Sequence, residues 1–502
     1  MRQLKRAVAG SNASRSGGRT GSRVLRRWDF AVWSTIALAG CTLGPDYRRP
    51  ELQVPSAWRI STEEAGHISD VAWWDRFDDP VLSHLVRTAL ENNKDLAIAA
   101  ANVDQAFAQY GITRSALYPE LDANGSAQRD RLSESTAPNR VPPGYQAFND
   151  YRLNVSASYE LDVWGKLRRA TEAARASLLA SEEGRRTVVL TVVASVASAY
   201  VQLRALDRQL DIAKATTGAL GHAAIVQQER FDEGATPESD YRQAQSQFET
   251  AAAQVPELER QVVRQENLIH ALLGENPGSI ERGSTIDDLK PPDLPEGLPS
   301  SLLERRPDIR QAEQDLIAAN ADIGVAKAAY FPQISLTALF GLESAQVSDL
   351  FKGPSKSWSL GSTASLPIFT AGRVRNQVEQ AKAVQRKALY FYQKSIINAF
   401  EDFEGALVDR AKFEQIREEQ SKNVAALQRF RALAVLRYQE GATIYLEVAN
   451  AEQSLFNAQL QLVNTQSQLF QSYVNLYRAM GGGWVEAADS LGGRHASPMH
   501  SD

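Results

Sequence analysis

The sequence predicts a chain of mixed α and β structure that is internally duplicated, with short amphipathic strands and very long helices in each half. Three observations predict this class. The two halves repeat each other at an offset of 207 residues, several stretches alternate apolar and polar side chains, and two stretches of about 65 residues contain no proline and little glycine. With 43% hydrophobic and 23% charged residues among 502, the composition is that of a folded protein.

The first 40 residues are predicted to be a lipoprotein signal peptide rather than part of the fold. A basic start leads into a short apolar stretch, residues 30–40, which ends in small side chains. The run Leu38-Ala39-Gly40-Cys41 resembles the bacterial lipoprotein signal, in which the chain is cut before the cysteine. That resemblance implies S-diacylglycerol and N-palmitoyl groups on Cys41, and Thr42 after it favours the outer membrane. The alternative is a buried free cysteine.

The composition disfavours several other classes of protein. Without the leader the chain carries 47 basic and 59 acidic residues, and a net charge of −12 does not suit nucleic acid. An intrachain disulfide needs a second cysteine, and six scattered histidines do not favour a metal site. Asp75, Asp78 and Asp79 could bind a metal, but we expect Asp79 to cap a helix that starts at Pro80. Beyond residue 40 we expect no apolar run long enough for a spanning helix.

Internal repetition sets the predicted organisation. Residues 230–236 and 437–443 read RFDEGAT and RYQEGAT, and the same offset pairs Asp240 with Glu447. An offset of 213 pairs Tyr118-Pro119 with Phe331-Pro332. We predict the following segments: a leader at 1–40, an N-terminal segment with the first helices at 41–110, a first repeat at 111–290, a second repeat at 300–480, and a flexible tail at 481–502.

Each repeat is predicted to contain two strands, at about 120–130 and 150–162 in the first and at about 333–343 and 356–366 in the second. Across residues 151–161 every odd position is apolar and every even position is polar. This pattern suits either a half-exposed sheet on a soluble core or the wall of a transmembrane barrel, and aromatic strand ends favour the wall. Because four strands cannot close a barrel in lipid, a wall would need several chains, and three would supply twelve strands.

The remaining stretches predict long helices at about 166–231 and 374–440, with returning helices at about 237–273 and 444–480. A helix of about 65 residues is roughly 100 Å long, which is typical of coiled-coil-like pairing rather than of a globular core. The two reversals are Gly234-Ala235-Thr236 and Gly441-Ala442-Thr443, where glycine relieves the backbone.

Taken together, these features resemble the outer membrane factor family, the TolC-like channels, and most closely its lipidated drug-efflux branch of NodT/OprM-like lipoproteins. No single motif is specific, but their joint order is. The residues that carry the resemblance, besides the corners and reversals above, are Cys41, Gly44-Pro45-Asp46-Tyr47, Trp73-Trp74, Leu272-Leu273-Gly274 and Arg306-Pro307-Asp308-Ile309.

The resemblance implies a homotrimer with a twelve-stranded barrel in the outer membrane and a periplasmic tunnel of long helices. It also implies a periplasmic adaptor, an inner-membrane pump and outer-membrane lipid as partners. The adaptor would contact the two helix tips, residues 234–236 and 441–443. Solutes would pass through without chemical change.

The resemblance also suggests a gate at the periplasmic end. In the family a leucine just beyond the second tip forms the narrowest point, and an aspartate one turn later forms a charged ring. Leu446 matches the leucine, whereas Asn450 replaces the aspartate, so that Glu447 could supply the charge, with Asp240 as its counterpart in the first repeat. The alternative is a packing role for Leu446 and solvated helix faces for the two acids.

The predicted function is therefore the outer-membrane channel of a tripartite efflux system, which exports small molecules passively. Two alternatives stay open: the exit duct of a type I protein-secretion system, and a non-conducting structural lipoprotein of the envelope. An enzyme is disfavoured because the sequence lacks Gly-x-Ser-x-Gly, a phosphate-binding glycine loop and His-Glu-x-x-His. No cofactor is expected beyond the covalent lipid.

Overall fold

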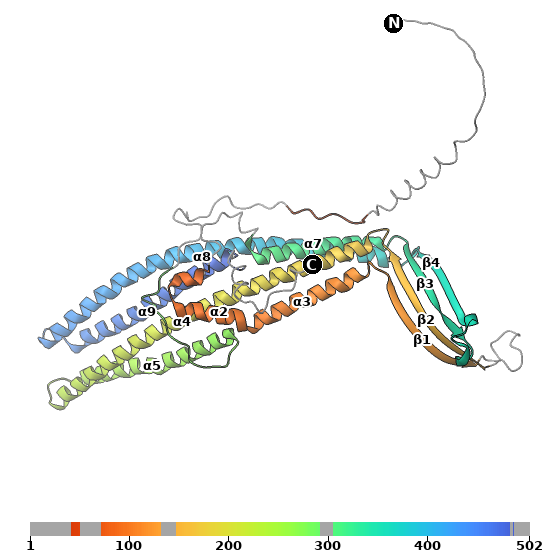
Figure 1. Cartoon of the computed structure of the whole chain (residues 1–502). Helices are drawn as coiled ribbons and strands as arrows, with labels where there is room; N and C mark the ends of the chain where they lie inside the picture. The colour runs from red at the N-terminus through yellow and green to blue at the C-terminus, as the bar shows by residue number, and fades with distance from the viewer. Residues whose placement is uncertain (1–41, 51–71, 132–146, 292–304, 482–484, 486–502) are drawn as a thin grey trace, which may run out of the picture.

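The computed structural model describes residues 42–50, 72–131, 147–291, 305–481 and 485 of the chain. The predicted leader, Cys41 and nearly all of the predicted tail lie outside the described residues. Figure 1 shows a long molecule with a β-sheet at one end and two helix-pair tips at the other. The sheet and the tips are therefore separated by the length of the helices.

Two series of elements follow one another along the chain. The first is η1 (Trp73–Phe77), α2 (Pro80–Asn92), α3 (Lys94–Ser115), β1 (Glu120–Arg131), β2 (Ala147–Leu161), α4 (Lys166–Asp232) and α5 (Glu238–Leu273). The second is α7 (Pro307–Ala328), β3 (Gln333–Ser344), η2 (Val347–Asp349), η3 (Gly353–Ser355), β4 (Lys356–Ser365), α8 (Arg373–Gln439) and α9 (Tyr445–Ala479). Helices α4 and α8 each have 67 residues, and α3 and α7 each have 22.

The matched lengths correct the predicted start of the first repeat. The predicted boundary between residues 110 and 111 cuts α3, which is the counterpart of α7. The first repeat therefore begins near Asn93. At the other end, Gly481 packs against Arg306 and Val485 is buried in the helical core, so the predicted flexible tail does not begin at residue 481.

The sheet is an antiparallel meander in the order β1-β2-β3-β4. Its register places apolar residues opposite one another, as in the pair Val155 and Phe340, because side chains alternate between the faces of a strand. These side chains are not covered: Val155 is 50% exposed, Phe340 61% and Leu360 81%. No helix of the described residues lies across either face in Figure 1. The alternative of a sheet on the chain's own soluble core is therefore wrong.

The helical core lies where η1 and α2 pack on α4, α5 and α9. Trp73, Trp74 and Phe77 are fully buried there, and the Trp73 ring stacks on Tyr477 with centroids 5.3 Å apart. Aromatic side chains of this size contribute much of the apolar area that a helical bundle buries. The short η1 segment, which precedes the first repeat, thus packs against the end of the second repeat.

Helix α4 corrects the expectation that no stretch beyond residue 40 is apolar enough to cross a membrane. It holds an 18-residue window that meets that condition by length and composition. Because 72% of this window is buried inside the protein, the apolar side chains form the core of the helical bundle.

Asp79 is the N-cap of α2, as predicted. Its Oδ1 accepts hydrogen bonds from Val81 N at 2.9 Å and Leu82 N at 3.2 Å. Its Oδ2 accepts from the Tyr200 hydroxyl and from Ser284 N, both at 2.9 Å. One buried carboxylate therefore joins α2, α4 and the segment after α5.

Asp75 and Asp78, which the sequence groups with Asp79 as possible metal ligands, have partners of their own. Asp75 accepts a hydrogen bond from the Ser83 hydroxyl, and Asp78 forms an ion pair with Lys290 at 2.6 Å. The three carboxylates of the hypothetical metal site thus serve three different contacts.

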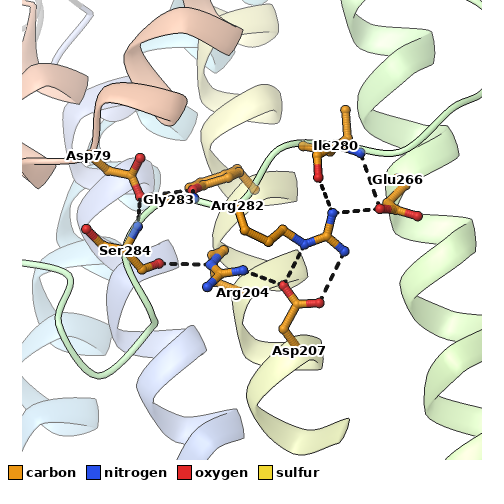
Figure 2. Close-up of polar contacts among 9 residues, drawn as sticks. Asp79, Arg204, Asp207, Glu266, Ile280, Arg282, Gly283 and Ser284 are labelled. Carbon is orange, nitrogen blue, oxygen red and sulfur yellow. Dashed lines mark hydrogen bonds and ion pairs between the residues drawn. The ribbon is translucent and has the colours of Figure 1, made fainter. Parts of the chain in front are cut away.

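A second polar cluster holds the segment after α5 across the helices (Figure 2). Arg282 bonds Asp207 of α4 at 2.9 Å and Glu266 of α5 at 2.6 Å. Arg204 bonds the same Asp207 and donates to Ser284 O at 2.8 Å. Arginine can satisfy several acceptors at once, so two guanidinium groups tie the segment to both helices.

The same joint closes each repeat. In the first, Asn93 Nδ2 donates to Leu272 O at 2.7 Å, and in the second, Arg306 Nη1 donates to Ala479 O at 3.2 Å. The following glycines, Gly274 and Gly481, have φ angles of +72° and +77°. A Cβ would lie 2.4 Å from Asn92 O at the first and 2.6 Å from the Arg306 Cα at the second. Both repeats have therefore retained the hydrogen bond and the close contact between the glycine and the start of the facing helix.

Candidate functional site

The predicted site residues gather at the two helix tips, which lie at the end of the molecule opposite the sheet (Figure 1). Gly234 and Gly441 have φ angles of +73° and +72°, the left-handed conformation that ends many helices. In the first tip Ala235 N donates to Arg230 O at 2.7 Å, and in the second Ala442 N donates to the equivalent carbonyl at 2.8 Å. The two tips therefore have the same backbone.

The second tip is closed by an ion pair. The Arg437 Nη1 lies 2.6 Å from Glu447 Oε1, and the Thr443 hydroxyl bonds the other carboxylate oxygen. Within the single chain the predicted ring carboxylate is thus paired with a cation.

Leu446 and Asn450 lie one turn apart on an exposed face of α9. Leu446 is 46% exposed and lies outside the buried cluster that joins α5, α8 and α9. The members of that cluster are Ala244, Ala434, Tyr445, Val448, Ala449 and Ala451. The alternative of a packing role for Leu446 between helices of one chain is therefore not what the structure shows.

Asp240 lies in the first turn of α5 and is half-buried. Its carboxylate accepts a hydrogen bond from the Ser239 hydroxyl at 3.3 Å. Burial, together with the negative charges of Glu452 and Asp240 and the neighbouring Tyr438, raises the pKa of Tyr445 to about 12. Asp240 is the smallest of these contributions, and its carboxylate lies close enough to the second hairpin to disfavour ionisation of the Tyr445 phenol.

Sequence reasoning missed a set of contacts between the two hairpins. The Gln227 Nε2 donates to the Tyr438 hydroxyl at 2.9 Å, and Arg230 Nη1 donates to the same hydroxyl at 3.1 Å. The Arg230 guanidinium also lies 5.3 Å from the centre of the Tyr438 ring. Farther from the tips, Gln247 Nε2 donates to Ala449 O at 2.7 Å.

We call the group formed by Gln227, Arg230 and Tyr438 the cross-hairpin clasp. The signal that could have found it is one of the two differences between the repeated tip sequences, because Tyr438 stands where the first repeat has Phe231. A hydroxyl present in only one copy indicates a contact that the other copy does not make.

The start of the described chain lies at the junction between the sheet and the helices. Leu43 N donates to Trp164 O at 3.2 Å, and a Cβ on Gly165 would lie 2.9 Å from the Thr42 Cα. Arg169 of α4 then holds the segment through an ion pair with Asp46 at 2.6 Å. The residue that follows Cys41 is thus fixed where β2 ends and α4 begins.

Comparison with known proteins gives one consistent result. A model of the outer membrane efflux protein family matches residues 85–275 and 298–482. The toluene efflux pump outer membrane protein TtgF of Pseudomonas putida is 37% identical over 467 residues, which is 91% of this chain and 96% of that protein. The cation efflux system protein CusC of Escherichia coli is 34% identical over 458 residues, 90% of this chain and 97% of that protein.

Solved structures agree with the sequence matches. The outer-membrane channel OprN has a TM-score of 0.81 and 30% identity, and covers 89% of this chain and all of its own. The CmeC outer membrane channel of Campylobacter jejuni has a TM-score of 0.84 and 28% identity, and covers 92% of this chain and all of its own. The mixed fold predicted from the sequence is thus the fold of solved outer-membrane channels.

Proposed function

Since this chain belongs to the outer membrane efflux protein family, we propose that three copies of it form one passive duct across the outer membrane and into the periplasm. The chain is an outer-membrane efflux channel protein, and the predictions of family, location and channel role are confirmed. The role of the family is that of a channel rather than of an enzyme. The proposal concerns how copies of this chain build the duct, close it and connect it to a pump.

The observation that carries the proposal is the incomplete sheet. Strands β1 and β4 are its two edges, and large apolar side chains of the sheet are exposed. In lipid an open edge leaves backbone groups without partners, which costs several kcal/mol for each group. Pairing β4 of one copy with β1 of the next removes every edge, and the up-and-down order makes each new pair antiparallel as well.

Three copies give twelve strands, an even number within the range of transmembrane barrels. The exposed apolar residues would then face lipid, where burial of hydrocarbon is favourable rather than costly. The opposite face, which carries Asn154, Ser158 and Thr337, would line a watery lumen.

We propose that Cys41 carries the lipid anchor. Support comes from the position of Thr42, which lies where the sheet meets the helices and therefore at the expected membrane boundary. A diacylglycerol and an acyl chain on one residue give lasting attachment, because each buried CH₂ contributes about 0.8 kcal/mol. Mass spectrometry of the purified protein tests this, and an unmodified cysteine or an uncleaved leader would contradict it.

We place the closed point of the duct at Leu446. Its side chain is exposed in one chain, so three copies around an axis would bring three leucines together. A narrow apolar constriction can stop ions by excluding water. The cross-hairpin clasp supports this arrangement, because it fixes the position of the second hairpin against the first. Opening the duct then requires the clasp to be released.

The partners would be a periplasmic adaptor and an inner-membrane pump. Relatives such as TtgF are named as the outer membrane proteins of efflux pumps. At the tips of this chain Gly234, Ala235, Gly441 and Ala442 are exposed, and small exposed residues allow another helix to approach the backbone closely. Both tips are therefore the proposed contact with the adaptor.

Recording of single channels in planar bilayers tests the function. We expect a small resting conductance that rises several-fold in Leu446→Ala, with Asn457→Ala in the same helix as a control variant of unchanged conductance. A protein that inserts into the bilayer and never conducts would support the structural-lipoprotein alternative. An unchanged closed state in Leu446→Ala would remove that leucine from the gate while leaving the duct in place.

A further inference from the structure

We infer that Arg230 exchanges partners when the duct opens, leaving Tyr438 of the second hairpin and pairing with Asp240 of its own tip. The inference rests on the proposed function, because it concerns how the proposed clasp is released. It goes beyond that function by naming a switch between two partners of Arg230, of which the second, Asp240, corresponds to Glu447 of the other repeat.

The first step is the equivalence of the two tips. They share five of seven residues, and their glycines have φ angles within one degree of each other. The hydrogen bonds from Ala235 N and Ala442 N to the preceding arginine carbonyls are 2.7 and 2.8 Å long. Equivalent side chains therefore start from equivalent backbone positions.

The second step is that equivalent side chains have different partners. In the second tip Arg437 pairs with Glu447, ten residues later, at 2.6 Å. The equivalent pair in the first tip is Arg230 and Asp240, also ten residues apart. This pair is not formed in the structure, because the guanidinium is directed toward the Tyr438 hydroxyl at 3.1 Å.

The third step is that Asp240 is left with a weak partner. Its carboxylate accepts a 3.3 Å bond from its neighbour Ser239, and no basic side chain of the described residues forms an ion pair with it. It is half-buried beside Tyr445, where it disfavours ionisation of the phenol. A half-buried carboxylate gains from a charge-assisted hydrogen bond more than from a neutral one.

These observations describe an element with two arrangements. While the hairpins are in contact, Arg230 gains a hydrogen bond and a cation–π contact from Tyr438. When the second hairpin moves away, both contacts are lost, and the second tip shows the geometry that the arginine can adopt instead. Aspartate is shorter than glutamate by one methylene, about 1.5 Å, which the flexible arginine side chain can cover. The exchange leaves the guanidinium paired in both states.

The exchange also explains why the tyrosine occurs in only one repeat. Tyr438 offers Arg230 a partner across the hairpins, whereas Phe231 at the equivalent position offers Arg437 none. The arginine of the second tip therefore stays within its tip, and the arginine of the first tip alone is free to change partners. The residue that changes partners is thus in the first tip, and the position of the second hairpin decides which partner it has.

The test is a set of planar-bilayer recordings on the full-length assembled protein. Tyr438→Phe removes the hydroxyl of the clasp and is expected to raise open probability. Adding Asp240→Asn to that variant is expected to lower open probability about three- to tenfold, because the released arginine then has no carboxylate. The matched control is Glu238→Gln in the same turn, which removes a charge paired with Arg242.

The outcomes separate the switch from the gate. If Tyr438→Phe raises open probability and Asp240→Asn does not reduce it, the partner exchange is wrong and the gate stands. If Asp240→Asn alone raises open probability, Asp240 holds the closed state and the exchange is again wrong. If Tyr438→Phe has no effect in a protein that still assembles, the proposed clasp itself fails. Assembly of each variant is checked by its native mass in detergent.

Discussion

The two repeats are joined alike where α5 and α9 end, and they are closed differently at their tips. At the joint, Asn93 and Arg306 donate to carbonyls at equivalent positions, 2.7 and 3.2 Å away. At the tips, Arg437 pairs within its own hairpin, whereas Arg230 reaches Tyr438 of the other. The difference teaches that duplication preserved the backbone, while side-chain differences gave the equivalent arginines different partners.

The largest effect is expected from Arg306→Ala. The Arg306 side chain is 10% exposed, and its guanidinium bonds Asp308, Asp402 and Ala479 O, so it ties α7 to both α8 and α9. Breaking a buried ion pair costs about 3–5 kcal/mol, and the partial exposure of both carboxylates reduces this to roughly 2–3 kcal/mol. Thermal unfolding of the detergent-solubilised protein measures the loss.

The matched variant at the equivalent joint of the first repeat is Asn93→Ala. It removes an N-cap and one hydrogen bond, for which we expect a cost of about 1–2 kcal/mol. Equal losses in the two variants would mean that the charge at the second joint adds nothing to its stability.

The next prediction compares the stability cost of replacing a glycine at the joint with that of replacing a glycine at a tip. Gly481→Ala should cost roughly 2 kcal/mol, because it combines a left-handed φ angle with a Cβ placed 2.6 Å from the Arg306 Cα. Gly441→Ala has the same φ penalty and nothing within 4 Å, so about 1–2 kcal/mol is expected. Unfolding midpoints of the two variants check the order, and a costlier tip variant would contradict it.

A smaller change should convert the second tip toward the first. Tyr438→Phe removes one hydroxyl and its three hydrogen bonds with Gln227 and Arg230, worth about 1–2 kcal/mol together, and leaves the ring in place. We expect raised conductance together with a small drop in unfolding temperature. Tyr445→Phe is the control, since that side chain contributes ring packing and forms no side-chain hydrogen bond within the described part of the chain. A rise of equal size in the control would assign the effect to loosened packing.

The smallest effect is expected from Glu447→Gln. An exposed ion pair contributes up to about 1 kcal/mol, so stability should change little. Because Arg437 already balances this carboxylate, the preference for cations over anions should also stay nearly the same. Reversal potentials in a salt gradient measure it, and a loss of cation preference would restore Glu447 to the predicted charged ring.

Much of the architecture could be predicted from the sequence. The eleven alternating residues 151–161 lie within β2, and the repeated tip residues mark both reversals, because these signals depend on neighbours along the chain. The apolar window of α4 could not be assigned in the same way, since a buried helix and a spanning helix have similar composition.

Less of the site could be predicted. Residue types indicated Leu446 and Glu447, but only the folded chain shows that the first is exposed and the second paired. The clasp joins residues about 210 positions apart, as in the bond between Gln227 and Tyr438. Its formation depends on how two helix pairs lie side by side, and helix periodicity within each pair does not determine that. The lipid modification of Cys41 stays a prediction, because this residue lies outside the described residues.

The most direct test of the account is a cross-link between neighbouring chains. Strands β1 and β4 are separated by two strands in one sheet, so their Cα atoms lie about 14 Å apart, beyond the roughly 7 Å that a disulfide allows. We predict that paired cysteines scanned along these two strands give covalent dimers and trimers on oxidation. Monomers alone at every position, in a protein that is folded and inserted in the membrane, would contradict a barrel shared among three chains.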